Sequence, residues 1–275
     1  MRETIELRVP EANAEEFLPP GMGMRLGMVR KVSVDTSDPT YAEIGRLQLE
    51  FRARGKWFFH GWGFHRHYSM SELAQAELLC VRPGRTFEPP GELCGTVYDD
   101  SSGCPECGTG ARQTTQLFLD GRRIPKGPDF ACTIADENIV SSRAAAVLRG
   151  LTGARLEPVR LSNEHGAVST EYFQLEVTAP YSDLDPKTLV GEGPFERPDY
   201  GLCPRGDLAG LNLISEVYVR RKSLTDADVL ATAQWVGVRR GLLRPRRLML
   251  LSPKGFRAIQ DAGLKGLVIE VAHVV

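Results

Sequence analysis

Hydrophobic and polar positions along the chain predict short strands interspersed with short helices. Residues 47–51 alternate apolar and polar side chains, and this period of two predicts a strand. Ser69 and Glu72 have the spacing of a capping box, so we expect a helix to begin there and to run to about Cys80. Residues 82–93 are rich in proline and glycine, which favours a linker and ends an N-terminal segment near residue 90.

The chain beyond this linker contains two segments with the same order of landmarks. Each segment begins with a Cys-Pro turn, continues through a strand and a loop into a short helix, and closes with a further strand. Chance similarity between two β-rich segments is the alternative to an internal duplication. The landmarks that align are Cys104 with Cys203, Asp129 to Thr133 with Asp228 to Thr232, Ile139 to Ser142 with Leu250 to Pro253, and Leu156-Glu157 with Ile269-Glu270.

Local chemistry supports a helix at the same place in each segment. Ser141 and Ser252 are suited to cap a helix N-terminus, and Gly150 and Gly263 are suited to the turn that ends it. Strands mixed with short helices predict an α+β fold. The expected organisation is an N-terminal β-rich segment with one helix (1–90), a first repeat (91–175) and a second, degenerate repeat (176–275).

The most specific motif in the chain is Cys104-Pro-Glu-Cys107-Gly. Two thiolates at this spacing can bind one tetrahedral Zn²⁺, and the flanking Asp, Ser and Gly residues indicate a knuckle between turns. A thioredoxin-like redox motif would instead follow an apolar strand and open a helix. We therefore favour structural zinc over redox chemistry, with a motif that binds no metal as the remaining alternative.

A single C-x-x-C motif supplies only two of the four zinc ligands, so the others must come from elsewhere. The repeat offers Cys203, although position 206, where a second cysteine would be expected, is Gly. Cys94, which a glycine follows, is the next candidate, and Asp207 or a histidine could also serve. The remaining cysteines fit apolar elements and are expected to be buried thiols, namely Cys80 and Cys132.

These motifs resemble those of the double-CXXCG proteins, which are described as paralogues in myxobacteria. The resemblance is carried by the CPECG knuckle, by the Cys-Pro pair 99 residues later, and by the segment 252–270 (S-P-K-x-F … G-L-K-G-L … E). This helix-and-strand segment is also similar to bacterial immunity proteins of polymorphic toxin systems. The resemblance covers residues 90–275 and implies a non-enzymatic zinc-binding protein that neutralises a cognate protein toxin. The second knuckle departs from the pattern because its second cysteine is missing.

Residues 56–68 (KWFFHGWGFHRHY) are dense in aromatic and histidine side chains. A strand here would place His65 and His67 on one face. A catalytic metal at the three histidines of this run is one alternative, but the run contains no carboxylate to orient the imidazoles. We favour a strand with aromatic side chains at an interface. The candidate partner-binding residues are Trp57, Trp62 and His65.

A second candidate surface is the arginine-rich loop 239–247. Arg244, Arg246 and Arg247 can bind carboxylates or phosphates through paired hydrogen bonds. A nucleic-acid-associated zinc-knuckle protein is therefore the alternative function. It is less favoured than a protein partner, because the chain is not basic overall and no aromatic stacking motif lies among the arginines.

Composition and charge exclude several classes of protein. The 275 residues are 42% hydrophobic, and 34 Lys and Arg against 35 Asp and Glu give a net charge of −1, which is typical of a globular protein rather than a disordered one. No apolar run is long enough to span a membrane, and the acidic first residues do not form a signal peptide, so we expect a cytoplasmic protein. The sequence contains no nucleophile elbow, P-loop, H-E-x-x-H or dinucleotide motif, so we do not expect an enzyme.

Overall fold

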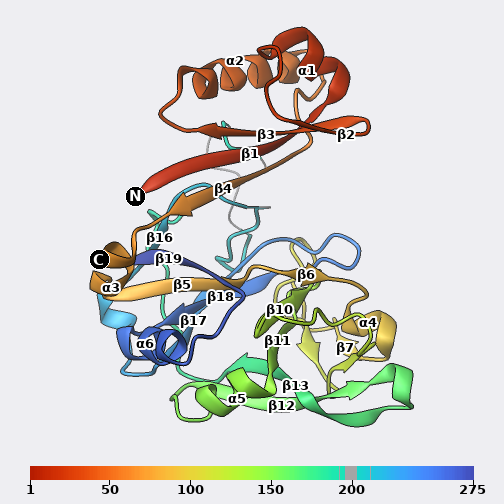
Figure 1. Ribbon diagram of the computed structural model, residues 1–275, viewed down its shortest axis with the longest axis vertical. Helices are drawn as coiled ribbons and strands as arrows, with labels where there is room; N and C mark the ends of the chain where they lie inside the picture. The colour runs from red at the N-terminus through yellow and green to blue at the C-terminus, as the bar shows by residue number, and fades with distance from the viewer. Residues whose placement is uncertain (192, 196–202, 211) are drawn as a thin grey trace.

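The computed structural model describes residues 1–191, 193–195, 203–210 and 212–275. Helices and strands are mixed along these residues, which confirms the predicted α+β class. A small sheet with two helices lies at one end of the molecule, and two larger sheets lie at the other (Figure 1). Within the described residues, no helix is both long and apolar enough to cross a membrane.

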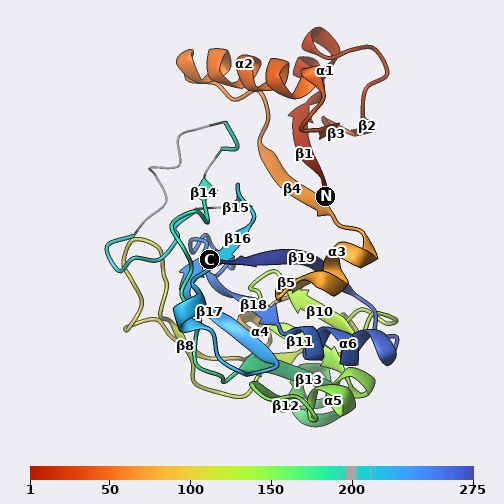
Figure 2. The same cartoon turned by 90° about the vertical axis from the view of Figure 1, so that its left-hand side faces the viewer.

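The N-terminal residues form an antiparallel sheet in the order β2-β3-β1-β4, and two helices cover one of its faces (Figures 1 and 2). Alternate side chains of the central strand, among them Ile5 and Leu7, are buried against Phe58 and Phe59. The elements are β1 (Arg2–Pro10), α1 (Glu11–Phe17), β2 (Met24–Leu26), β3 (Val29–Asp35), α2 (Pro39–Ala53) and β4 (Gly61–His67). The predicted strand within 56–68 is therefore confirmed as β4.

The strand predicted over residues 47–51 is wrong, because this stretch lies inside α2. Asp38 caps the helix through its side chain, and Pro39 occupies the first turn. Ile44 and Leu47 face the core from successive turns. Five alternating residues are too few to distinguish a strand from one face of a helix. The Asp38-Pro39 pair further upstream is the specific signal for a helix start.

The capping box at Ser69 is confirmed, but the helix that it opens, α3 (Met70–Gln75), is short. The chain then enters β5 (Leu78–Pro83), so Cys80 lies within a strand rather than at the end of a helix. β5 is hydrogen-bonded on both sides within one of the larger sheets. The expected linker at 82–93 therefore begins inside a sheet, and the chain leaves the N-terminal sheet after residue 67 instead.

The two larger sheets have the same strand order. The first is β6-β10-β11-β13-β12-β9, and the second is β17-β18-β5-β19-β16. The strands β9 and β16 at one edge run parallel to their neighbours, and the next three pairings in each sheet are antiparallel. The place of β6 is taken in the second sheet by a single parallel bridge between Ser182 and Thr232. The bounds are β6 (Thr86–Phe87), β9 (Phe118–Leu119), β10 (Phe130–Thr133), β11 (Asn138–Ser141), α5 (Ser142–Leu148), β12 (Ala154–Leu161), β13 (Ala167–Val177), β16 (Val217–Val219), β17 (Val229–Val236), β18 (Arg246–Leu251), α6 (Pro253–Asp261) and β19 (Leu267–Val274).

The strand registers show which residues of the two sheets are equivalent. They superpose Phe130 on Val229 and Val140 on Leu251, as the sequence alignment of the two segments predicted. The two segments therefore form the same arrangement of strands. The pairs that establish it are Val140 with Phe130 and Phe173 in the first sheet, and Leu251 with Val229 and Leu79 in the second.

The same registers show that the two repeats exchange a strand. β5 precedes the first knuckle in the chain but lies between β18 and β19 of the second sheet. β13 precedes the second knuckle but lies between β11 and β12 of the first sheet. Each repeat thus completes the sheet of the other. The repeats span 78–161 and 167–274, so the expected boundaries at 90 and 175 separate β5 from its repeat and cut through β13.

Two aspartates bind the repeats to each other in the same way. Asp129 accepts hydrogen bonds from the Ser141 hydroxyl (2.8 Å) and, across the interface, from the Lys265 N–H (2.8 Å). Asp228, its equivalent, accepts from the Ser252 hydroxyl (3.3 Å) and from the Thr152 N–H (3.0 Å). The next residue after each N–H donor is a glycine with positive φ, at 153 and 266, where a Cβ would lie 2.0 and 2.7 Å from a carbonyl of the other repeat.

A hairpin projects from each repeat and carries its knuckle. The first pairs β7 (Tyr98–Asp99) with β8 (Arg112–Gln113), and the second pairs β14 (Val190–Gly191) with β15 (Asn212–Leu213). A short helix, α4 (Gly91–Cys94), precedes the first hairpin. The two hairpins are equivalent, because each sits between the exchanged strand and the parallel edge strand of its repeat.

We predict that Asp129→Asn and Asp228→Asn each lower the free energy of unfolding by about 1–3 kcal/mol at neutral pH. Burial alone would raise the pKa of both carboxyls, but the N–H and side-chain donors outweigh it and lower both pKa values. The carboxylates therefore contribute stability above the pKa of the unfolded chain and lose it as the pH falls through the folded pKa. Urea titrations should show the difference from wild type shrinking toward about pH 3.

Asp226→Asn is the matched control, because Asp226 is exposed and lies two residues before Asp228. It should change stability by less than about 0.5 kcal/mol. A loss in the control as large as that in Asp228→Asn would mean that the cross-repeat bonds are not the cause.

Candidate metal centre

Three cysteines from the two repeats meet where the hairpins touch. The Sγ atoms of Cys104, Cys107 and Cys203 all lie within 4.8 Å of one another, and the three residues are buried. Tetrahedral zinc bound by thiolates requires Sγ atoms that converge on one point at about 2.3 Å from the metal. The arrangement therefore could hold a metal ion, and it confirms the expectation that Cys203 joins the first knuckle.

The first knuckle is closed by its own backbone. The Gly108 N–H donates to the Cys104 carbonyl (2.8 Å), and the Cys104 N–H donates to the Thr109 carbonyl (2.7 Å). Gly108 has a φ of +76°, which a glycine adopts without strain. Thr109 also places its hydroxyl 3.2 Å from the Cys107 sulfur.

The second knuckle has the same turn with one residue fewer. The Gly206 N–H donates to the Cys203 carbonyl (2.9 Å), and the Cys203 N–H donates to the Asp207 carbonyl (2.9 Å). Gly206 has a φ of +81° and so corresponds to Gly108, and Asp207 corresponds to Thr109. The expected match of position 206 with Cys107 is therefore wrong: the second cysteine is deleted here, not replaced by glycine.

Backbone N–H groups point at the knuckle sulfurs. Donors at Cys107 and Glu106 lower the pKa of the Cys104 thiol, and the Arg205 N–H lies 3.4 Å from the Cys203 sulfur. Burial raises the pKa of Cys107 to about 11 in the absence of a metal. A bound cation would hold all three sulfurs as thiolates, which links metal binding to proton release.

The remaining cysteines and Asp207 lie in different positions relative to the cluster of three thiols. Asp207 is buried, with Oδ2 3.8 Å from the Cys203 sulfur and Oδ1 accepting from the Trp235 N–H (2.8 Å). Neither Asp207 nor Cys94, the last residue of α4, belongs to the group whose ligand atoms all lie within 4.8 Å of one another. Cys132 is buried in β10 as expected, whereas Cys80 in β5 is only half-buried as a residue, and desolvation of its thiol raises the pKa of Cys80 to about 12. Neither cysteine belongs to the cluster of three thiols.

The histidines of β4 do not belong to a group of three or more described side chains that could share a metal ion. Among the described residues, the cysteine cluster is the one group of three or more His, Cys, Asp or Glu side chains close enough to share an ion. His65 lies 3.8 Å from Glu6 of β1, and burial lowers the pKa of the His65 imidazole. Trp57 packs under the Arg52 guanidinium, and Trp62 packs edge-on against Phe64. A catalytic metal at the histidines has no support in this geometry.

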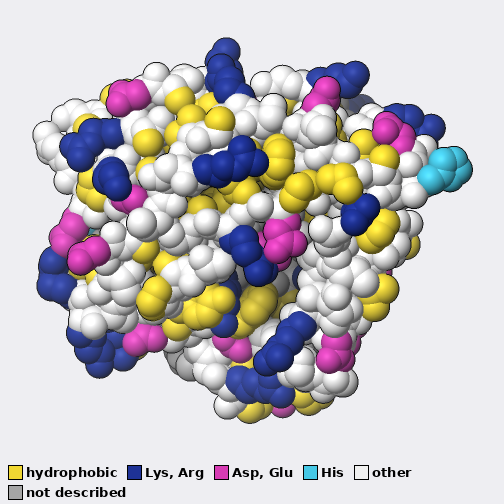
Figure 3. Space-filling view, turned by 90° about the horizontal axis from the view of Figure 1, so that it is seen from below, with side chains coloured by type: hydrophobic (Ala, Val, Ile, Leu, Met, Phe, Trp, Pro, Cys, Tyr) yellow, Lys and Arg dark blue, Asp and Glu magenta, His cyan; other side chains and the backbone are white. Residues whose placement is uncertain are grey.

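Arg244 and Arg246 of the 239–247 segment have carboxylate partners within the protein, and Arg246 and Arg247 lie in β18 rather than in a loop. The side chain of Arg244 is only 7% exposed, lies over the Tyr98 ring and pairs with Glu92 (2.9 Å) and Asp100 (3.0 Å). Arg246 pairs with Asp136 (2.9 Å). The face of the molecule seen from below shows Lys and Arg side chains interspersed with acidic ones, not gathered in one patch (Figure 3).

Sequence reasoning missed the residues that hold these arginines and the repeats in place. Asp100 and Glu92 lie 144 and 152 residues before Arg244, and no motif links them or Tyr98 to that arginine. Asp129 and Asp228 did carry a signal, since they occupy the same place in the two aligned segments. The alignment of buried polar residues could therefore have identified them.

Comparison with known proteins does not assign the chain to a family. No protein-family model matches the chain, and no curated protein matches it. The resemblance to double-CXXCG proteins therefore stays a prediction from the motifs.

We predict that Arg244→Ala lowers the free energy of unfolding by about 1–3 kcal/mol, because it removes the cation above Tyr98 and the buried partner of two carboxylates, which keep only their contacts with the more exposed Arg239. Arg257→Ala is the control, since Arg257 is exposed on α6. Equal stability of the two variants in denaturant titrations would show that the buried arginine contributes little.

Proposed function

We propose that the protein is a non-enzymatic zinc-binding protein in which a structural Zn²⁺ joins the two repeats. The observation that carries this proposal is the convergence of Cys104 and Cys107 from one repeat with Cys203 from the other. Thiolates are the ligands that structural zinc sites use most, and N–H donors to the sulfurs stabilise them.

A bound metal would add a further link between the hairpin tips, where Arg205 already donates a hydrogen bond to the Ser102 carbonyl (2.9 Å). The strands β7, β8, β14 and β15 have two residues each, and short hairpins alone are marginal in water. The apolar side chains packed against the three cysteines are Ala209 and Val238. A metal at this point adds its binding free energy directly to the folding of both hairpins.

Asp207 is the residue that we propose as the fourth ligand. Its Oδ2 lies beside the Cys203 sulfur, and it replaces Thr109 at the point where the second knuckle has lost a cysteine. A carboxylate oxygen is an accepted zinc ligand. The other oxygen remains with the Trp235 N–H, which fixes the carboxylate.

The experiment is elemental analysis of purified protein and its variants. We expect about one zinc per chain in wild type and in Cys94→Ser, and loss of zinc in Cys104→Ser, Cys107→Ser and Cys203→Ser. Asp207→Asn keeps the acceptor for Trp235 and should weaken zinc binding about tenfold or more in a chelator competition.

A cysteine inserted between Arg205 and Gly206 restores the length of the first knuckle and should bind zinc more tightly than wild type. Zinc retained by Cys203→Ser would contradict a site shared between the repeats. Wild-type protein purified under reducing conditions without any metal, and unable to take up added zinc, would contradict the proposal as a whole.

The activity that we propose is binding of a partner protein, with a cognate toxin as the partner that the double-CXXCG resemblance implies. An exposed apolar surface supports protein binding: Met24, Leu26 and Met28 lie at the edge of the N-terminal sheet, and Met28 is 86% exposed. The half-buried Trp57, Trp62 and His65 lie elsewhere on that N-terminal unit. The nucleic-acid alternative is weaker, because Arg244 and Arg246 already have carboxylate partners.

A further inference from the structure

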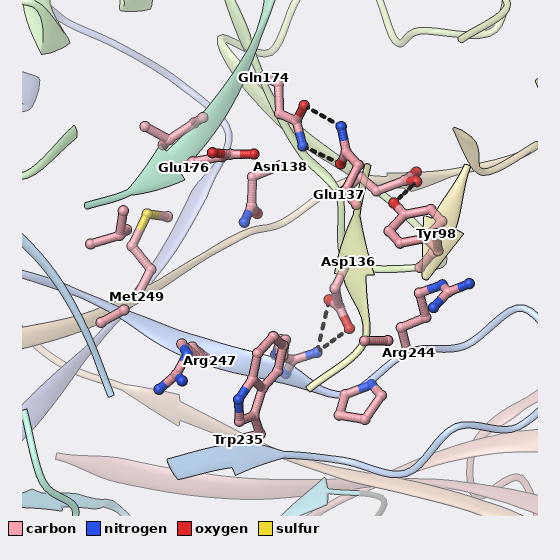
Figure 4. Close-up of a pocket in the computed structure, with 18 of the residues that line it drawn as sticks. Tyr98, Asp136, Glu137, Asn138, Gln174, Glu176, Trp235, Arg244, Arg247 and Met249 are labelled. Carbon is pink, nitrogen blue, oxygen red and sulfur yellow. Dashed lines mark hydrogen bonds and ion pairs between the residues drawn. The ribbon is translucent and has the colours of Figure 1, made fainter. Parts of the chain in front are cut away.

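A cavity of about 310 Å³ lies between the sheets of the two repeats (Figure 4). Its walls come from β11 and β13 of the first sheet, from β17 and β18 of the second, and from the hairpin that carries the first knuckle. Leu175, Met249 and Trp235 supply apolar surface. The volume and the mixture of apolar walls with a few polar groups are typical of small-molecule sites.

The acidic side chains of the cavity wall are already bound within the protein. Among the described residues, three carboxylates line the cavity, and each has strong donors of its own. Arginines compensate the charges of Asp136 and Glu176, and neutral donors occupy the oxygens of Glu137. The bonds are Asp136 with Arg246 (2.9 Å), Glu176 with Arg155, and Glu137 with the Tyr98 hydroxyl (2.5 Å), the Thr133 hydroxyl (2.6 Å) and the Gly91 N–H (2.8 Å).

Arg247 is different, because within the described part of the chain no carboxylate pairs with it. Its Nη1 donates to the Thr232 carbonyl (2.7 Å) and to the Ala233 carbonyl. Its guanidinium lies 3.8 Å from the centre of the Tyr181 ring and 4.8 Å from that of Trp235. The two rings fix the plane of the guanidinium, and the two carbonyls engage its Nη1 atom. No hydrogen bond to a described residue engages the opposite edge, formed by Nε and Nη2.

A second polar side chain in the cavity has hydrogen-bonding atoms that no described residue engages. The side-chain amide of Asn138, at the start of β11, points into the space bordered by Arg247 and Met249 (Figure 4). No hydrogen bond from this amide to another described residue is present. A cavity that contains a fixed cation and an unbonded amide beside apolar walls is suited to a ligand with one anionic group and an apolar body.

We propose that this cavity binds a small organic carboxylate, with Arg247 as the residue that recognises its charge. The Nε–Nη2 edge matches the two oxygens of a carboxylate. A single arginine balances one negative charge, which favours a carboxylate over a phosphate dianion. The residues that recognise the ligand are not the proposed metal ligands: none of the three cysteines lines the cavity, although Gly108 of the first knuckle does.

Calorimetric titration with benzoate tests the proposal, because benzoate combines a carboxylate with a flat apolar ring. We expect saturable binding of one benzoate per chain, with no binding of the neutral analogue benzamide at the same concentrations. Arg247→Lys keeps the charge but loses the paired geometry, and it should weaken binding about tenfold or more.

Asn138→Asp is a second variant, which adds a negative charge to the cavity without removing a hydrogen bond. It should also weaken benzoate binding about tenfold. Asn163→Asp is its matched control: the same change outside the cavity, at a side chain whose Oδ1 still accepts from the Gly121 N–H (2.7 Å). Affinity should be unchanged in this control, and circular dichroism should show all variants folded.

Three results would overturn the proposal. They are the absence of saturable binding of benzoate, acetate and citrate to folded wild-type protein, equal affinity of wild type and Asn138→Asp, and binding of inorganic phosphate without binding of any carboxylate.

Discussion

Each of the two larger sheets contains a central strand that belongs to the other repeat, and the rest of the molecule is arranged around this exchange. β5 and β13 are the central strands of their sheets, with hydrogen bonds on both edges. The apolar side chains of both sheets and of α5 and α6 therefore share one core. Because a backbone N–H or carbonyl left unpaired in such a core is costly, the two repeats are expected to fold as one cooperative unit.

The strand exchange also determines where the chemistry lies. It places the two knuckle-bearing hairpins side by side, so that Cys203 reaches the pair of thiols in the first knuckle. It also places the β11–β13 wall opposite β17 and β18, which creates the cavity around Arg247. The candidate metal centre and the candidate ligand site are thus both products of the interface between repeats, although they use different residues.

The two repeats share their strand order but differ at these sites. Asp129 and Asp228 have the same role in both repeats, because each accepts a hydrogen bond from the backbone of the other repeat. Replacing either one with an apolar residue would leave its donors unpaired. The knuckles have diverged, since a cluster completed by three cysteines from two hairpins does not need both knuckles to be intact. The second knuckle is one residue shorter than the first, and Asp207 occupies the position that corresponds to Thr109.

The sequence by itself determined the local signals: the α+β class, the order of elements in each repeat, the helix caps at Ser141 and Ser252, and the pair of thiols in the first knuckle. These depend on residues that are neighbours in the chain, so spacing and periodicity carry the information. The short alternation at 47–51 was misleading for the same reason, because five residues do not distinguish the two periods.

Only the tertiary structure decided the pairings between distant residues. No local pattern shows that β5 belongs to the sheet of the second repeat, or that Arg244 lies against Tyr98 and Asp100 rather than in solvent. Whether an arginine forms a surface, an ion pair or a ligand site depends on which carboxylates reach it, and that is set by how the sheets pack. Arg246 and Arg247 are adjacent in the sequence, yet packing gives one a carboxylate partner and leaves the other facing the cavity.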